Sequence, residues 1–261
     1  MKSSFLITLW VFSSLYLHAQ SIFASDRKCK ECHPTIYKEH KGAMHNNSTI
    51  FKDPIHKAVW DKHPANIKKA NYKCAKCHTP TASDLLSKGK AGIPDISNPT
   101  HRQGISCTYC HRIEAVELGT MSNKNLISKE EKNYFGTMEN PTKNEFHITQ
   151  TNDMFRNGQV CMGCHSHKKN KEKLDVCVTQ MAKQTSKENC ITCHMPKVAG
   201  SASLHKDSLT HSYHGFPGTN SGQDMLAQYI DMKFEKKNTS FEISIHNHSP
   251  HDMLLHPLRM L

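Results

Sequence analysis

The feature that most constrains this chain is a five-residue unit in which two cysteines stand three apart and a histidine follows at once. The unit occurs five times, as CKECH, CAKCH, CTYCH, CMGCH and CITCH, beginning at residues 29, 74, 107, 161 and 190. The five copies use ten of the 11 cysteines. Random placement of the same cysteines and histidines would give roughly 0.04 copies, so the spacing reflects a chemical requirement.

On a helical turn this spacing places both thiols on one face and the imidazole of the next residue beside them. Each thiol can add to a vinyl group of a porphyrin, and the histidine can coordinate the iron as the proximal ligand. The sequence therefore predicts five covalent haem c groups. The predicted attachment residues are Cys29, Cys32, Cys74, Cys77, Cys107, Cys110, Cys161, Cys164, Cys190 and Cys193. The predicted proximal ligands are His33, His78, His111, His165 and His194.

Three other uses of paired cysteines fit this pattern less well. A zinc ribbon needs two pairs for each metal ion and no histidine directly after every pair. A thioredoxin-like dithiol occurs once, near a βαβ unit. A disulfide framework gives no reason to repeat the histidine. Covalent haem attachment is the interpretation that uses both cysteines and the histidine of every unit.

Each iron needs a second axial ligand from outside the motifs. After residue 24 the chain holds 14 further histidines, more than five irons require. We therefore expect haems with two histidine ligands. Methionine ligation, for instance by Met44 or Met195, stays open, and it would raise the reduction potential.

The N-terminal residues have the pattern of a secretory signal peptide. Lys2 precedes an apolar run of 13 residues from Phe5 to Leu17, and cleavage can follow Ala19 or Ala24. The run is shorter than the ~20 residues that span a bilayer, so an uncleaved anchor is the weaker alternative. We predict export to the periplasm, with secreted or surface-attached forms left open.

The composition suits a chain filled by cofactors. Only 36% of the residues are hydrophobic and 7% are aromatic, so the macrocycles are expected to supply apolar volume. The formal charge is +11, or +10 after loss of Lys2, and about ten haem propionates would offset it. A nucleic-acid partner is therefore not expected. The basic cluster at residues 167–173 is interpreted as a solvated loop, with docking of an acidic partner as the alternative.

The predicted fold class is mainly α with extensive irregular structure, a multihaem cytochrome c with a compact haem-filled core. Short helices are expected around each motif, after Pro54, and over residues 152–165. From Gln228 apolar residues alternate with polar ones, which predicts a C-terminal β-hairpin with its turn at KKNTS. The predicted divisions are a signal peptide at 1–24, a pentahaem domain at 25–217 and a hairpin segment at 218–261.

Several stretches together resemble the cytochrome c-554 and hydroxylamine oxidoreductase group. They are CKECH with YKEHKGAMH, GISCTYCH, CITCHMP followed by HSYHGFPG, and FEISIHNHSPHDMLLHP. The resemblance implies distal ligands at His45, His101 and His147, at one of His211 or His214, and at His251. It also implies that the hairpin segment is part of a truncated β module. Because the haem count varies within the group, it does not imply which histidine serves which iron.

Cys177 has no motif of its own. It is interpreted first as a buried structural thiol. The alternatives are an intermolecular disulfide in a homodimer and, less favoured, a widely spaced attachment site with Cys193.

Two functions stay open. The favoured one is an electron carrier without catalytic residues, passing electrons between a quinol dehydrogenase or soluble donor and a terminal reductase. Its partners would be periplasmic or membrane redox proteins, with peripheral membrane contact left open. The alternative is a reductase or oxidase of a small nitrogen or sulfur compound at one haem with an open distal site. Because every motif ends in histidine, the Cys-x-x-Cys-Lys unit of pentahaem nitrite reductases is missing from this chain.

Overall fold

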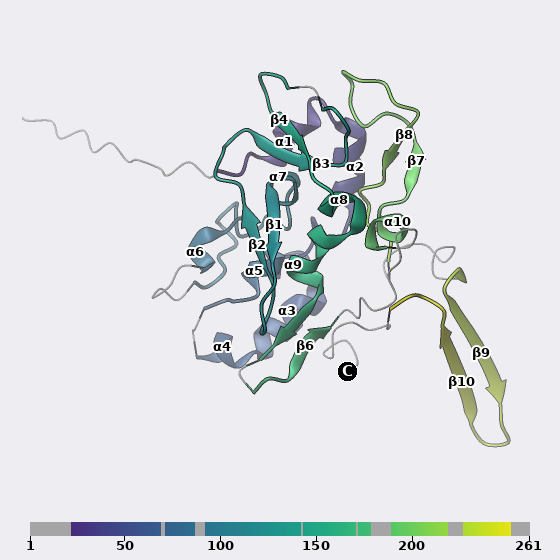
Figure 1. The fold of residues 1–261 in the computed structure, drawn as a ribbon. Helices are drawn as coiled ribbons and strands as arrows, with labels where there is room; N and C mark the ends of the chain where they lie inside the picture. The colour runs from purple at the N-terminus through teal and green to yellow at the C-terminus, as the bar shows by residue number, and fades with distance from the viewer. Residues whose placement is uncertain are drawn as a thin grey trace, which may run out of the picture.

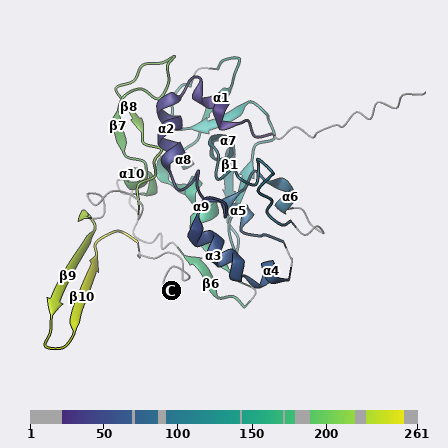
Figure 2. The same ribbon diagram turned by 180° about the vertical axis from the view of Figure 1, so that it is seen from behind.

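The computed structural model describes residues 22–68, 71–86, 92–141, 143–170, 172–178, 189–218 and 227–251. Figure 1 shows a body of short helices and paired strands, from which a long β-hairpin projects. The view from behind in Figure 2 shows the same separation of hairpin and body. Among the described residues, no helix has the length and apolar character needed to cross a membrane. Nearly all of the predicted signal peptide, residues 1–21, lies outside the described residues.

The helices of the described chain are short, and the longest have nine residues. Three of them begin at a proline, which suits the first turn because its missing N–H would have no partner there. The helices are α1 (Asp26–Lys30), α2 (Pro34–Gly42), α3 (Pro54–Lys62), α4 (Pro64–Ile67), α5 (Ala75–His78), α6 (Ser83–Leu86), α7 (Cys107–His111), α8 (Met154–Asn157), the 3-10 helix η1 (Gln159–Cys161), α9 (Met162–His165) and α10 (Cys190–His194). The predicted helices after Pro54 and before the fourth motif are confirmed.

Four motifs end in a helical turn that closes on the motif histidine: α5, α7, α9 and α10. The first motif instead bridges α1 and α2, because Pro34 starts a new helix directly after His33. Side chains fix two of these turns. Ser106 caps α7 by accepting from the Tyr109 N–H, and Asn189 forms a capping box with Thr192 at α10.

Four small sheets follow the third motif and precede the C-terminal hairpin. β1 (Ile113–Glu117) pairs with β2 (Lys124–Ile127), and β3 (Asn133–Gly136) pairs in parallel with β4 (Ile148–Thr151). β5 (His167–Lys169) pairs with β6 (Asp175–Val178), and β7 (Lys197–Ala199) with β8 (Thr210–Ser212). The sequence predicted irregular structure here. These strands have three to five residues, too few for an alternating pattern to be recognised.

The predicted C-terminal hairpin is confirmed. β9 (Ile230–Lys236) pairs antiparallel with β10 (Phe241–Asn247), and Phe234 lies opposite Ile243. Its base contacts the body at the fifth motif, where the Cys193 Sγ lies 3.7 Å from the Tyr229 hydroxyl.

The apolar core of the described residues consists of two small clusters. One surrounds Trp60, Tyr72 and Leu85, and the other surrounds Ile105 and Tyr109. Neither cluster contains a motif histidine. Cys74 and Ala75 of the second motif pack in the first cluster, and Tyr109 and Cys110 of the third motif pack in the second, so each cluster borders a predicted haem position.

Candidate haem sites

Backbone carbonyls orient four of the five motif histidines through the Nδ1 atom. The pairs are His33 with Ala202 O at 2.7 Å, His78 with Ser48 O at 3.1 Å, His111 with Phe135 O at 2.7 Å and His194 with Pro217 O at 2.6 Å. An Nδ1–H that donates to a carbonyl fixes the tautomer and leaves the Nε2 lone pair available to a metal. The motifs thus present their imidazoles in the form that iron requires.

Four motif histidines face a second histidine across a gap. The ring centroids of the pairs are 6.4 Å apart for His33 and His147, 6.2 Å for His111 and His214, 6.1 Å for His194 and His251, and 5.9 Å for His165 and His45. A metal–imidazole bond is about 2.0 Å, and the centroid lies about 1.1 Å behind the nitrogen. Two imidazoles that share one iron therefore have centroids about 6.2 Å apart. The spacing of all four pairs fits one iron between the rings.

The facing histidines come from segments distant from the motifs that they face. His45 follows α2, His147 precedes β4, His214 follows β8 and His251 follows β10. His214 donates from Nδ1 to Ser212 O at 2.7 Å, which leaves its Nε2 available on the side of His111.

Burial favours the neutral form of five of these imidazoles. It lowers the pKa of His45 and of His214 to about 3, and nearby histidines add to the effect. Burial also lowers the pKa of His111, His165 and His147. A neutral imidazole retains the lone pair that binds iron, so the electrostatics of these positions suit metal ligation.

The second motif differs from the other four. The ring centroid of His78 lies 4.0 Å from that of His56, which leaves no room for an iron between them. Both nitrogens of His56 also have other partners: Nδ1 lies 2.9 Å from Ser48 O, and Nε2 lies 3.0 Å from the Tyr72 hydroxyl. Among the described residues, His78 is thus the motif histidine that faces no partner at the spacing of a shared iron. His56 is one of the 14 histidines outside the motifs, and nothing in the sequence distinguishes it from the others.

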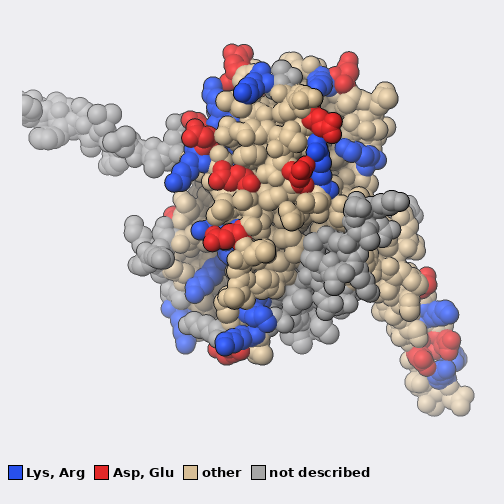
Figure 3. Space-filling view, in the orientation of Figure 1, with Lys and Arg blue, Asp and Glu red and all other residues tan. Residues whose placement is uncertain are grey.

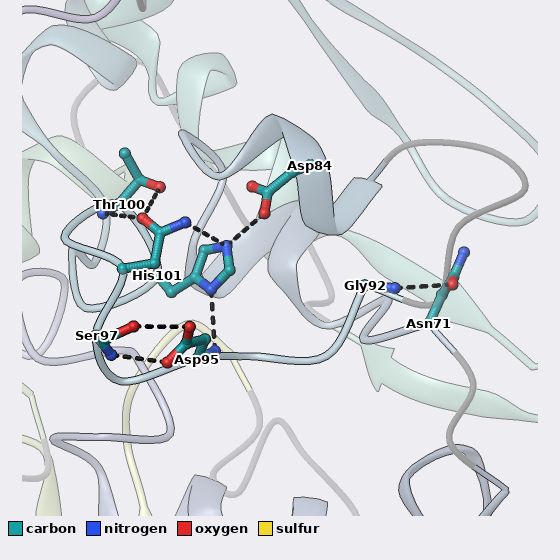
Figure 4. Close-up of polar contacts among 8 residues, drawn as sticks. Asn71, Asp84, Gly92, Asp95, Ser97, Thr100 and His101 are labelled. Atoms are coloured by element: carbon teal, nitrogen blue, oxygen red, sulfur yellow. Dashed lines mark hydrogen bonds and ion pairs between the residues drawn. The ribbon is translucent and has the colours of Figure 1, made fainter.

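His101 is placed in a hydrogen-bond network of its own (Figure 4). Its Nδ1 accepts from the Asp95 N–H at 3.0 Å, and its Nε2 lies 2.7 Å from the Asp84 carboxylate. The ring is only 4% exposed. No ring contact within the described part of the chain joins His101 to a motif histidine, so the structure does not bring this predicted ligand to an iron position.

Of His211 and His214, the structure places His214 opposite a motif histidine. The Nδ1 of His211 lies 2.9 Å from Gly200 O, and its Nε2 lies 2.8 Å from a Glu39 carboxylate oxygen. Both nitrogens of His211 are therefore engaged, whereas His214 faces His111. The other oxygen of Glu39 accepts from the His214 N–H at 2.9 Å, so the same carboxylate holds the backbone of the facing residue.

Cysteines of different motifs lie side by side. Thiol hydrogen bonds join Cys29 to Cys107, Cys77 to Cys164 and Cys161 to Cys190. The bond from Cys164 lowers the pKa of Cys77 to about 7. The first motif is thus adjacent to the third, and the fourth is adjacent to both the second and the fifth. Cys110 also influences Cys161 and Cys164 electrostatically, which places the third motif near the fourth.

One buried cation indicates that an anion belongs here. Arg112 follows the third motif histidine and is 0% exposed. Its terminal nitrogens donate to the carbonyls of Glu131 and Ser128, and its Nε atom has no hydrogen-bond partner among the described residues. A buried guanidinium needs a counterion, and no carboxylate of the described residues forms an ion pair with it. A haem propionate would supply that charge.

A small cavity of about 40 Å³ lies at the third motif. Cys107, Cys110, His111 and His214 line it together with Phe216. Both attachment cysteines and both facing histidines of the third motif therefore border one cavity.

Cys177 lies in β6, where its backbone pairs with Lys168. Its side chain lies outside the described atoms, so the interpretations of this residue stay predictions. The basic cluster at 167–173 begins in β5. Lys76 of the second motif donates to the Ser122 hydroxyl and to the Asn123 carbonyl, and the backbone of Ser122 pairs with Lys168 of this cluster.

Comparison with known proteins supports the predicted fold. The family described as Cytochrome c554 and c-prime matches residues 28–112, which hold the first three motifs. Among solved structures, the chain is similar to a penta-heme cytochrome c552 from Thermochromatium tepidum. The TM-score is 0.62 and the identity is 22%, over 90% of this chain and 68% of that chain. The search of curated proteins gives no match. The predicted fold class is confirmed.

Proposed function

We propose that this multihaem c-type cytochrome carries five haem c groups and serves as an exported electron-transfer protein. The observation that carries the proposal is the set of four facing histidine pairs at 5.9 to 6.4 Å. An iron with imidazoles on both sides has no free position for a substrate, so it can only exchange electrons. His147, His214, His45 and His251 would be the distal ligands opposite His33, His111, His165 and His194.

The adjacency of the motifs supports a continuous route for electrons. Contacts between cysteines link the first motif to the third, and the fourth to the second and fifth. Cys110 of the third motif lies near Cys161 and Cys164 of the fourth, which joins the two groups. In the bound state the haems supply the redox chemistry. The residues of the chain hold the haems in sequence, exclude water from the buried imidazoles and set the charge around each iron. The fourth motif would be the branch point of this route.

The alternative function has one specific observation in its favour. His78 lacks a facing histidine at iron spacing, and the nearby His56 is held by Ser48 and Tyr72. The second haem is therefore the one at which a small nitrogen or sulfur compound could bind iron directly. A reductase would also need a proton donor at that position, and the Tyr72 hydroxyl beside His56 is buried with a pKa raised by desolvation. A hydroxyl whose pKa is raised gives up its proton less readily, so the second motif lacks a good proton donor in Tyr72, and electron transfer is favoured as the main function.

The proposed location is the periplasm, and the proposed partners are periplasmic or membrane redox proteins. The support is the predicted signal peptide, together with covalent haem, which is attached outside the cytoplasmic membrane. The face shown in Figure 3 carries intermixed basic and acidic side chains, so it does not favour nucleic acid as a partner.

Low-temperature EPR of the oxidised holoprotein tests the ligand scheme. We expect four low-spin irons and one iron, at the second motif, without a second histidine ligand. Five haems should be present by intact mass. Two or more high-spin irons in the fully loaded protein would contradict the scheme.

Replacing His45 provides the sharper test. His45→Ala should keep five haems but convert one further iron, at the fourth motif, to high spin or to water ligation. The control is His205→Ala, because His205 is exposed. An unchanged spectrum in His45→Ala would remove His45 from the ligand set.

Reoxidation kinetics separate the two functions. The dithionite-reduced protein should be reoxidised slowly by nitrite, hydroxylamine, sulfite or tetrathionate. Turnover with one of them at about 1 per second or faster would establish the reductase alternative instead.

A further inference from the structure

The hairpin of β9 and β10, which projects from the body in Figure 1, has two chemically different faces. Cross-strand partners share a face, so the register places Met232 with Ile245, Phe234 with Ile243 and Lys236 with Phe241 on one side. Asp231, Lys233, Glu235, Glu242, Ser244 and His246 lie on the opposite side. The first set is here called the apolar face.

The apolar face is open to solvent. The side chains of Met232, Phe234, Phe241, Ile243 and Ile245 are between 56% and 72% exposed. Phe234 and Phe241 stack on each other at 5.1 Å, but the body does not cover them. Within the described residues the hairpin has no third strand and no covering layer, and an isolated two-stranded hairpin is marginally stable in water. A partner on this face would explain its length and its apolar composition.

The charges of the hairpin select among partners. Residues 230–247 contain three lysines and three acidic residues, so their formal charge is zero. Lys237 is paired within the hairpin with Glu235 at 3.1 Å and with Glu242 at 3.4 Å. Hairpin charges of both signs are visible in Figure 3. A surface that binds an anionic membrane has an excess of lysine and arginine, whereas the lysines of this hairpin are matched in number by its acidic residues.

We propose that the apolar face binds the same face of a second copy of this chain. The apolar face carries one charge, Lys236 beside the turn, and a two-fold contact in which the two hairpins run in opposite directions keeps the two Lys236 side chains apart, at its two ends. Two hairpins would pack face to face as a small sandwich about 10 Å thick. If each large side chain offers about 150 to 200 Å², of which more than half is exposed, two copies cover on the order of 1,000 Å². That area reaches the lower limit of stable protein interfaces.

The hairpin is held at its base by Tyr229 against Cys193, and His251, just beyond β10, faces His194. The proposal does not depend on the electron-transfer function, since it concerns a surface outside the haem positions.

Sedimentation of the holoprotein under reducing conditions tests the proposal. The wild-type protein should be a dimer at micromolar concentration. Ile243→Glu should weaken the dimer by about 100-fold or more, because it places a charge at the centre of the apolar face. The matched control is Ser244→Glu, which adds the same charge to the opposite face of the same strand and should leave the dimer unchanged.

Further variants keep the test decisive. Cys177→Ser should remain dimeric, because the proposed contact is not a disulfide. Haem content by intact mass reports folding, and Phe234→Ser replaces Ile243→Glu if that variant does not mature. A monomer at about 100 µM, or a dimer that survives both substitutions, would overturn the proposal. So would a monomer that binds phosphatidylglycerol vesicles through the hairpin, since the occupant would then be a membrane.

Discussion

The haem body and the hairpin differ in how their apolar packing is incomplete. The body contains few buried apolar side chains for its size, and its histidines face one another across gaps that fit iron. The hairpin contains a continuous apolar face that nothing in the described body covers. In the body the missing apolar volume is that of a cofactor, whereas on the hairpin it is that of another surface. Hydrophobic composition alone does not distinguish a region that binds a cofactor from one that binds another surface. The positions of histidine and cysteine do distinguish them.

The largest expected effect follows from removing a haem from the body. Cys161→Ser with Cys164→Ser should abolish attachment at the fourth motif, which lies against the second and fifth motifs. Total stability is about 5–15 kcal/mol, so losing this central macrocycle should prevent accumulation of folded protein. The check is haem staining and intact mass of the exported protein. Cys177→Ser is the control, and it should retain five haems; a four-haem control would show that Cys177 contributes to attachment.

A smaller effect is expected from the buried cation of the body. If Arg112 neutralises a propionate, Arg112→Gln should lower the free energy of unfolding by about 3–5 kcal/mol, because a buried charge loses its partner. One haem potential should also fall, since a cation stabilises the reduced iron. Arg156→Gln is the control. Arg156 pairs with Asp153 and Glu139 at the surface, so its loss should cost less than about 1 kcal/mol. Equal effects of the two substitutions on stability and potential would exclude the propionate contact.

The smallest effect is expected on the exposed face of the hairpin. The hydrogen bond and charge of His248 lower the pKa of Asp231. A carboxyl with a folded-state pKa below its unfolded value stabilises the fold above the unfolded pKa, and this is lost as the pH falls through the folded pKa. NMR signals of the hairpin should therefore weaken slightly between pH 5 and pH 3, and Asp231→Asn should abolish that change. A transition of the same size in Asp231→Asn would assign it to another group.

The sequence predicted the parts of the fold that depend on local chemistry. The motif turns, the helix after Pro54 and the alternation in β9 and β10 each follow from residues adjacent in the chain. The four small sheets after the third motif were not predicted, because strands of three to five residues carry too little pattern. The strands of β3 and β4 pair only through a long connection, so no local signal marks them.

The candidate ligands show the same limit. The resemblance named His45, His147 and His251, each of which the structure places opposite a motif histidine. It also named His101, which the structure instead places between Asp84 and Asp95. Spacing cannot distinguish a histidine held by a carboxylate from one that faces an open gap. Arg112 could have been noted as a basic residue directly after a motif, but its burial is visible only in three dimensions.

The order of the facing histidines along the chain has a consequence for assembly. In the proposed ligand scheme His45 precedes the fourth motif that it serves, whereas His147, His214 and His251 all follow the motifs that they serve. A chain that emerges from its N-terminus can therefore attach the first haem long before residue 147 arrives to close that iron. For this interval the first, third and fifth irons are open to oxygen and to wrong ligands. Correct maturation of this protein therefore requires that export of the distal histidines is faster than binding of oxygen or of a wrong ligand to irons that have one axial ligand.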